Sequence, residues 1–321
     1  MDNRMNPNTL EPQRKPAPTG HRPAFAWLVL AAAILMQLCL GATYSWSQFA
    51  TPLKDLFGVE LDAVQTPYTV FYIVFPITLV FAGELLHRIG PRKCALLGAV
   101  FFPMGWILAG LFGESRIVLI VSIGGISGLG AGLAYLVPIA TCVRWFPKYK
   151  GLVTGLAVAG FGGSAAIVAF VGSWLIDGLG MHVLRVFLIF GIGFALVTFA
   201  SALILRYPPD TVVAAHNPAC SRRTVLRGFS FWILFLGMTV GLAGGFLVNA
   251  NIRQLLPELE SAFPKKMAMA VSLFAIFNAA GRIVWGTLHD NLNPRGAVVG
   301  NLLFQAVAVG TGMETELGRI S

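Results

Sequence analysis

Apolar residues fall into nine long runs, separated by short segments that carry most of the charged residues. The runs cover about residues 26–49, 66–87, 94–113, 117–142, 151–176, 183–205, 229–250, 267–289 and 296–312. Most are close to the roughly 20 residues that an α-helix needs to cross the hydrocarbon core of a bilayer. They are continuous and rich in Gly, Ala and Leu, without the alternation typical of membrane strands. The pattern predicts nine membrane helices.

The composition points to the same class of protein. Apolar residues make up 56% of the chain, charged residues only 12%, and the mean hydropathy is +0.74. A soluble globular domain carries about 25% charged residues. The sequence shows no cluster of metal ligands, no hydrolase motif and no paired Cys and His residues. We therefore expect no enzyme, no cofactor and no bound metal.

The net charge of +9 raises the possibility of nucleic-acid binding, but the basic residues lie in alternate connecting segments. One set holds fifteen: Arg4, Arg14, Lys15, Arg22, Arg88, Arg92, Lys93, Arg144, Lys148, Lys150, Arg206, Arg222, Arg223, Arg227 and Arg295. The other set holds six: Lys54, Arg116, Arg185, Arg253, Lys265 and Lys266. Because basic residues concentrate on the cytoplasmic side, this predicts a multi-pass protein of the cytoplasmic (inner) membrane with a cytoplasmic N-terminus.

Two similar segments predict an internal repeat. Gly83–Lys93 joins the second and third runs, and Gly286–Arg295 joins the eighth and ninth, 203 residues later. The same offset separates the starts of the first and seventh runs, near residues 26 and 229. The predicted fold is an all-α membrane protein with a cytoplasmic N-terminal segment (1–23), a six-helix bundle (24–206), a cytoplasmic linker (207–228), a partial second bundle (229–312) and a tail (313–321).

The repeat also predicts where a second bundle of six helices would end. An offset of 203 residues from residue 206 places that end near residue 409, beyond residue 321. The polar residues 313–321 do not continue the apolar pattern. On this basis we expect helices ten to twelve to be missing, as in a C-terminally truncated protein.

Parallel repeats of six helices resemble the major facilitator superfamily, whose substrate site lies between the two halves. Further motifs resemble the oxalate:formate antiporter family and, more distantly, the monocarboxylate transporters. They are Gly41–Ser47, Pro52–Asp55, Ala63–Thr66, Gly128–Tyr135, Arg144–Pro147 and Phe277–Arg282. The resemblance implies a secondary transporter of small carboxylate anions that works by alternating access, as an antiporter.

Arg282 is the first candidate for substrate binding. It lies eight residues before Asp290, at the end of its apolar run, and so about 12 Å inside the membrane at 1.5 Å per residue. An arginine within a bilayer is costly, and its planar group suits a carboxylate. The resemblance assigns this position to carboxylate recognition. The alternative is an arginine that pairs with an acidic side chain or backbone carbonyls of the protein.

The resemblance adds further candidates for the substrate site. Tyr44 and Tyr135 match aromatic positions around the substrate in the family, and Asn278 lies one helical turn before Arg282. Thr43 stands where the family has Gln, and Phe161 where it has Tyr, so both changes reduce the capacity for hydrogen bonds and weigh against oxalate itself as the substrate. The family also places a lysine on helix eleven. Ordinary helix packing is the alternative for the two tyrosines and for Asn278.

The repeated segments supply candidates for gating: Gly83, Arg88, Gly90, Arg92, Gly286, Asp290 and Arg295. Such charges can hold the two halves together in one state and release them in another; solvated loop charges are the alternative. The expected partners are a small organic anion and the lipid bilayer, with the chain as a monomer and no nucleic acid. Other functions left open are a carboxylate sensor, an inactive truncated transporter, a carrier of another solute, and proton symport in place of antiport.

Overall fold

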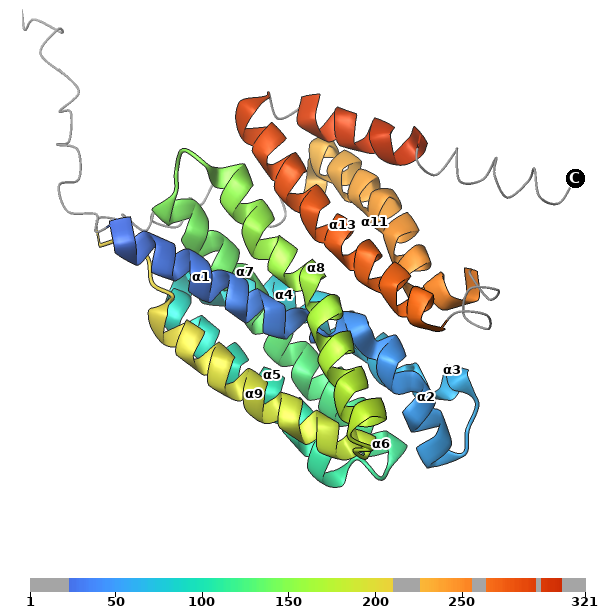
Figure 1. Ribbon diagram of the computed structural model, residues 1–321. Helices are drawn as coiled ribbons and strands as arrows, with labels where there is room; N and C mark the ends of the chain where they lie inside the picture. The colour runs from blue at the N-terminus through green and yellow to red at the C-terminus, as the bar shows by residue number, and fades with distance from the viewer. Residues whose placement is uncertain (1–22, 210–225, 256–263, 293–295, 308–321) are drawn as a thin grey trace, which may run out of the picture.

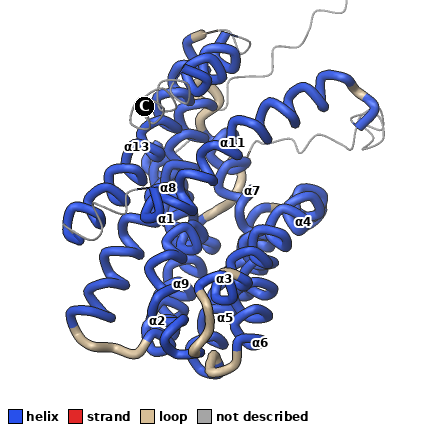
Figure 2. The backbone as a smooth tube through the Cα atoms, turned by 90° about the vertical axis from the view of Figure 1, so that its right-hand side faces the viewer, coloured by secondary structure: helices blue, strands red, loops and turns tan. Residues whose placement is uncertain are grey.

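The structure is a computed structural model that describes residues 23–209, 226–255, 264–292 and 296–307. These residues form helices and connecting turns, without a strand (Figure 2). The helices are α1 (Pro23–Leu40), η1 (Gly41–Ser45), α2 (Trp46–Phe57), α3 (Leu61–Val64), α4 (Thr66–Ile89), α5 (Pro91–Phe112), α6 (Arg116–Leu119), η2 (Ile120–Ser127), α7 (Gly128–Trp145), α8 (Lys150–Ser173), η3 (Trp174–Gly178), α9 (Val183–Ile204), α11 (Phe229–Leu255) and α13 (Pro264–Asn291). A further helix covers Gly296–Val307. The all-α prediction is confirmed.

Six helical spans in the described part of the chain are long and apolar enough to cross a membrane. They are Ala24–Phe57, Leu61–Ile89, Pro91–Phe112, Arg116–Trp145, Lys150–Gly178 and Val183–Ile204. They match the first six predicted runs, and α11, α13 and Gly296–Val307 match the last three. The first span reaches Phe57, beyond the predicted end at residue 49, because the helix continues to Gly58, which has a φ of +60° and ends it.

The turns between the spans follow from the residues at the helix ends. Gly90 has a φ of +81°, which favours glycine, and its N–H donates to the Leu86 carbonyl at the end of α4. Pro91 then begins α5, where a missing N–H costs nothing. At the other end of the bundle, the His182 side chain accepts a hydrogen bond from the Leu184 N–H at the start of α9. These short connections keep successive helices antiparallel.

Helices approach each other closely at glycines, which have no side chain. A Cβ at Gly130 of α7 would lie 2.1 Å from the Phe102 backbone nitrogen of α5, and one at Gly41 would lie 2.1 Å from the Phe161 carbonyl oxygen of α8. In the ribbon view α13 lies along α8, on the side of the six-span bundle where α11 also lies (Figure 1). The α8–α13 contact therefore joins the first six spans to the later helices.

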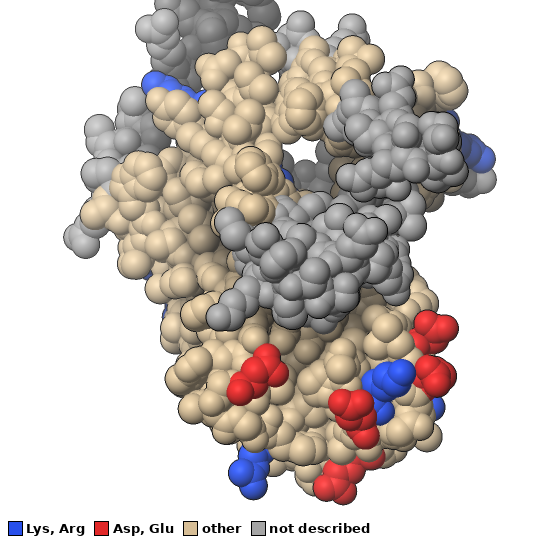
Figure 3. Space-filling model, turned by 45° about the vertical axis from the view of Figure 1, so that its right-hand side comes forward, with Lys and Arg blue, Asp and Glu red and all other residues tan. Residues whose placement is uncertain are grey.

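The surface has the pattern expected in a bilayer. Large apolar side chains point outward from the spans, for example Val80, Phe170 and Leu196, which are 67%, 76% and 69% exposed. In the space-filling view, charged side chains gather at the lower end of the molecule, basic side chains are also visible near its upper end, and most of the described surface between them is uncharged (Figure 3). An exposed apolar belt of this extent is stable against lipid rather than water.

Candidate functional site

Four aromatic rings from four helical segments meet inside the first bundle. Phe161 of α8 is 2% exposed. Its ring lies 5.0 Å from that of Tyr44 in η1, 5.2 Å from that of Tyr135 in α7 and 6.2 Å from that of Phe75 in α4. The structure thus brings together three residues that the sequence predicted separately. We refer to Tyr44, Phe75, Tyr135 and Phe161 as the aromatic cluster.

Hydroxyl groups line one side of the aromatic cluster. Thr43 Oγ1 and Tyr72 Oη are 3.4 Å apart, a long hydrogen bond in which either can donate. The Tyr72 ring stacks on the Tyr44 ring with their centres 6.1 Å apart. The ring of Tyr68, one turn earlier on α4, lies 4.6 Å from the Tyr72 ring. The sequence analysis missed Tyr68 and Tyr72. Their spacing of four residues, continued by Phe75, places them on one face of α4 and could have indicated them.

Arg282 reaches α8 beside the aromatic cluster. Its Nη1 donates a hydrogen bond of 2.7 Å to the Val158 carbonyl oxygen, and a Cβ at Gly162 would lie 3.2 Å from Arg282 Cζ. Val158 and Gly162 flank Phe161 along the helix, so the guanidinium lies next to this ring's segment of α8. Among the described residues no carboxylate lies within ion-pair distance of Arg282. Arg282 therefore has a backbone carbonyl partner, which was the alternative given above. That hydrogen bond uses only one of the five N–H donors of its guanidinium.

Asn278 lies one turn before Arg282 on α13. Its Oδ1 is buried and has no hydrogen-bond partner among the residues that the structure describes, and a Cβ at Gly162 would come within 2.7 Å of that oxygen. The absence of a side chain at Gly162 therefore makes room for both Asn278 and Arg282. A buried polar atom without a partner is costly in the protein interior. No group in the described part of the chain offsets this cost for Asn278.

The sequence analysis also missed two buried polar side chains where α1 meets α8. Gln37 is fully buried; its Nε2 is 3.4 Å from the Tyr135 carbonyl oxygen, and its Oε1 has no partner in the described part of the chain. Ser164 is fully buried with an unpaired Oγ. A Cβ at Gly41 would lie 2.9 Å from Ser164 Cβ. The signal in the sequence was a glutamine near the middle of an apolar run, where a polar side chain costs free energy unless it has partners.

Asp290 joins α13 to the start of α8. Its Oδ1 accepts a hydrogen bond of 2.7 Å from the Gly151 N–H, and its Oδ2 accepts one of 2.8 Å from the Leu152 N–H. Free N–H groups and the helix dipole make this end of a helix favourable for a carboxylate. A Cβ at Gly286 would lie 2.3 Å from the Gly151 carbonyl oxygen. Two predicted gating residues, Gly286 and Asp290, thus lie in the α8–α13 contact.

The first copy of the repeated segment has different contacts. Arg88 forms an ion pair with Glu84 within α4, while Gly90 supplies the turn to α5. Arg92 is exposed at the start of α5, and Gly83 is half-buried, where a Cβ would meet Leu136 at 3.8 Å. These predicted gating residues are not brought to the α8–α13 contact. Arg295 lies outside the described residues.

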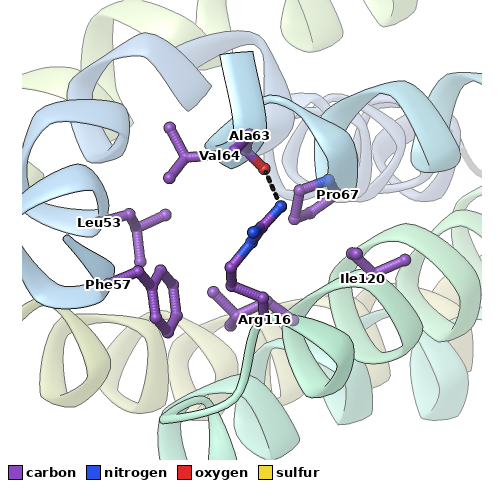
Figure 4. Close-up of a pocket in the computed structure, with 8 residues that line it drawn as sticks. Leu53, Phe57, Ala63, Val64, Pro67, Arg116 and Ile120 are labelled. Carbon is purple, nitrogen blue, oxygen red and sulfur yellow. Dashed lines mark hydrogen bonds between the residues drawn. The ribbon is translucent and has the colours of Figure 1, made fainter. Parts of the chain in front are cut away.

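A small cavity lies beside Arg116 (Figure 4), the first residue of α6, which is at the end of the bundle away from residues 146–150 (Figure 1). Arg116 Nη2 donates a hydrogen bond of 3.3 Å to the Ala63 carbonyl oxygen, between Phe57 and Pro67. The cavity volume is about 10 Å³, room for about one water molecule. It is too small for an organic anion. Elsewhere in the described residues, no group of three or more His, Cys, Asp or Glu side chains could hold a metal ion.

Six apolar spans, an aromatic cluster within them and an arginine from a later helix together define a polytopic α-helical membrane protein of the carrier type. The chain belongs to the Major Facilitator Superfamily, whose family model matches residues 20–313. This confirms the predicted superfamily.

Individual relatives agree with the predicted resemblance. The oxalate:formate antiporter of Oxalobacter formigenes is 28% identical over 273 residues, covering 83% of this chain and 64% of the antiporter. An uncharacterized MFS-type transporter of Escherichia coli (strain K12), YhjX, is 25% identical over 270 residues, covering 83% of this chain and 66% of the relative. Monocarboxylate transporter 13 of Bos taurus is 26% identical over 270 residues, covering 83% of this chain and 62% of that transporter. The chain spans about two thirds of the length of these curated relatives.

Proposed function

We propose that this chain belongs to a secondary transporter of small carboxylate anions that works by alternating access and exchanges one anion for another. The observation that carries the proposal is Arg282, whose guanidinium reaches from α13 to α8 beside Tyr44, Tyr135 and Phe161. A carboxylate held there would take hydrogen bonds from the guanidinium and the phenols. The resemblance to the oxalate:formate antiporter points to the same class of substrate.

Exchange follows from the charge of the site. An empty site leaves a buried positive charge that opposes the motion of the two halves, because an unpaired charge inside a membrane is costly. A bound carboxylate neutralises Arg282 and lowers that cost, so the loaded carrier moves faster than the empty one. Carboxylate uptake driven by a proton gradient alone would instead identify a symporter.

Asp290 is the proposed gating contact. While the Asp290 side chain accepts hydrogen bonds from the N–H groups of Gly151 and Leu152, the start of α8 and the end of α13 stay together. Breaking these two bonds would let the helices separate on the side of residues 146–150, which the distribution of basic residues assigns to the cytoplasm. On the same assignment we propose that the N-terminus lies in the cytoplasm and that the protein is in the inner membrane.

The test uses the purified chain in proteoliposomes loaded with unlabelled anion. Labelled oxalate, formate, pyruvate and lactate are added outside in turn, and uptake is compared with that of liposomes without internal anion. Antiport predicts that internal anion accelerates uptake of at least one label. Saturable binding without flux would favour a carboxylate sensor, whereas no binding of any of the four anions would reject the proposed substrate class.

A further inference from the structure

A groove between α1 and α9 faces the membrane. It has a volume of about 300 Å³ and, apart from Ser201, is lined by apolar side chains from both helices, which run side by side (Figure 1). Leu28 and Leu35 on α1 and Leu196 on α9 are 46%, 48% and 69% exposed, so the groove opens outward. Small residues, among them Ala31 and Ala200, give it depth. Its shape and apolar lining suit one hydrocarbon chain.

One end of the groove carries a fixed positive charge. Ile204 of α9 lines the groove, and Arg206 follows two residues later. The Arg206 guanidinium lies 4.3 Å above the ring of Phe25, which precedes Leu28 by one turn of α1. Trp145 Nε1 donates a hydrogen bond of 2.7 Å to the Arg206 carbonyl oxygen. Both contacts hold the arginine at the mouth of the groove.

The guanidinium keeps its donors available. Arg206 is exposed, and among the described residues no carboxylate lies within ion-pair distance of it. A second arginine lies at the same end of the bundle, where Arg144 sits 3.6 Å above the ring of Tyr207. An exposed arginine at the end of an apolar groove attracts a ligand that combines an anionic head with a hydrocarbon tail.

We infer that this groove binds one anionic phospholipid. One acyl chain lies along α1 and α9, and the phosphate accepts hydrogen bonds from Arg206, whose planar group binds phosphate in two-point geometry. A free phosphate would use only the arginine and leave the groove empty. The inference does not depend on the transported substrate, because the groove lies on the membrane-facing side of α1 and α9.

Native mass spectrometry of the purified full chain in a neutral detergent tests the inference. An equimolar mixture of phosphatidylglycerol and phosphatidylcholine is added, and the ratio of the two singly lipid-bound species is measured. We expect phosphatidylglycerol to be preferred about fivefold, because the attraction between one arginine and an anionic lipid surface is worth about 1 kcal/mol. Arg206→Gln should abolish the preference, and Arg206→Lys should keep most of it.

Two controls separate this site from general effects. Arg185→Gln removes an exposed arginine at the opposite end of α9 and should leave the preference unchanged. Ala200→Phe fills the groove and should lower phosphatidylglycerol binding severalfold, whereas Val80→Phe on the membrane-facing surface of α4 should not. The inference would be overturned if Arg206→Gln and Arg185→Gln lowered the preference for phosphatidylglycerol equally, or if Ala200→Phe left phosphatidylglycerol binding unchanged. Competition by glycerol phosphate at the lipid's own concentration would reassign Arg206 to a soluble phosphate and reject a lipid site.

Discussion

Replacing Asp290 by alanine removes the contact that joins the end of α13 to the start of α8. The substitution deletes two acceptors, so the N–H groups of Gly151 and Leu152 lose their partners. It also removes a negative charge from the positive end of the α8 dipole. The apolar and glycine contacts of the two helices remain, among them the approach of Gly155 to the Arg282 carbonyl.

The expected size of the effect follows from these two hydrogen bonds. Removing a side chain that caps a helix N-terminus costs about 0.5–2 kcal/mol, and hydrogen bonds to a charged group lie at the upper end of the range for such bonds. A loss of about 2 kcal/mol changes the ratio of two conformations about 30-fold, since 1.4 kcal/mol corresponds to tenfold. Asp290→Ala should therefore shift the carrier strongly toward the state in which α8 and α13 are apart.

Pulsed electron paramagnetic resonance measures this shift directly. Spin labels on cysteines at Lys148 and Asn291, both exposed, report the distance between the two helix ends. Cys220 is replaced by serine, and Cys39, Cys94 and Cys142 are buried and should stay unlabelled. We expect the long-distance population to grow in Asp290→Ala.

The matched control is Asp177→Ala, which deletes an exposed carboxylate bonded to Ser173 at the other end of the span that contains α8. It should leave the distances unchanged. An unchanged distribution in Asp290→Ala, or an equal change in Asp177→Ala, would refute the proposed gating contact.

Three further predictions concern packing and binding. Gly155→Val should lower the thermal stability of the purified protein, because its Cβ would lie 2.4 Å from the Arg282 carbonyl oxygen, whereas Gly125→Val has open space and should not. Trp46→Phe loses the 3.1 Å hydrogen bond from Trp46 Nε1 to the Val64 carbonyl oxygen. A thermal melt should show that the free energy of unfolding falls by about 1 kcal/mol; an unchanged value would mean that the hydrogen bond contributes nothing to stability. Tyr135→Phe should weaken anion binding about tenfold in a titration, the cost of one hydrogen bond to a charged ligand, and unchanged affinity would exclude that hydroxyl from the site.

The helices could be predicted because the bilayer sets both their length and their apolar character. The runs that begin near residues 66, 94 and 183 match α4, α5 and α9 closely. The first span was predicted too short, since Trp46–Phe57 mixes apolar and polar residues after Ser45 and hydropathy alone does not mark its end. Helix ends of this kind depend on local turns such as Gly58.

Parts of the site could be predicted from local spacing. Arg282 was indicated by its charge within an apolar run, and Asn278 by its position one turn away. The partner of Asp290 could not be predicted, because Gly151 lies 139 residues earlier and takes part through its backbone N–H, which any residue but proline has. Tyr72 was missed for a similar reason. Its role depends on Thr43, 29 residues away on another helical segment.

Counterflow by Arg282 variants tests the proposed transport function most directly. Proteoliposomes with equal amounts of wild type, Arg282→Lys, Arg282→Gln or Arg116→Gln are loaded with unlabelled anion and given the labelled anion outside. We expect wild type and Arg116→Gln to exchange alike, since Arg116 lies at the small cavity at the far end of the bundle. Arg282→Gln should lose exchange, and Arg282→Lys should retain about a tenth or less, because a lysine lacks the two-point geometry. Exchange at the wild-type rate in Arg282→Gln would contradict a carboxylate site built on this arginine.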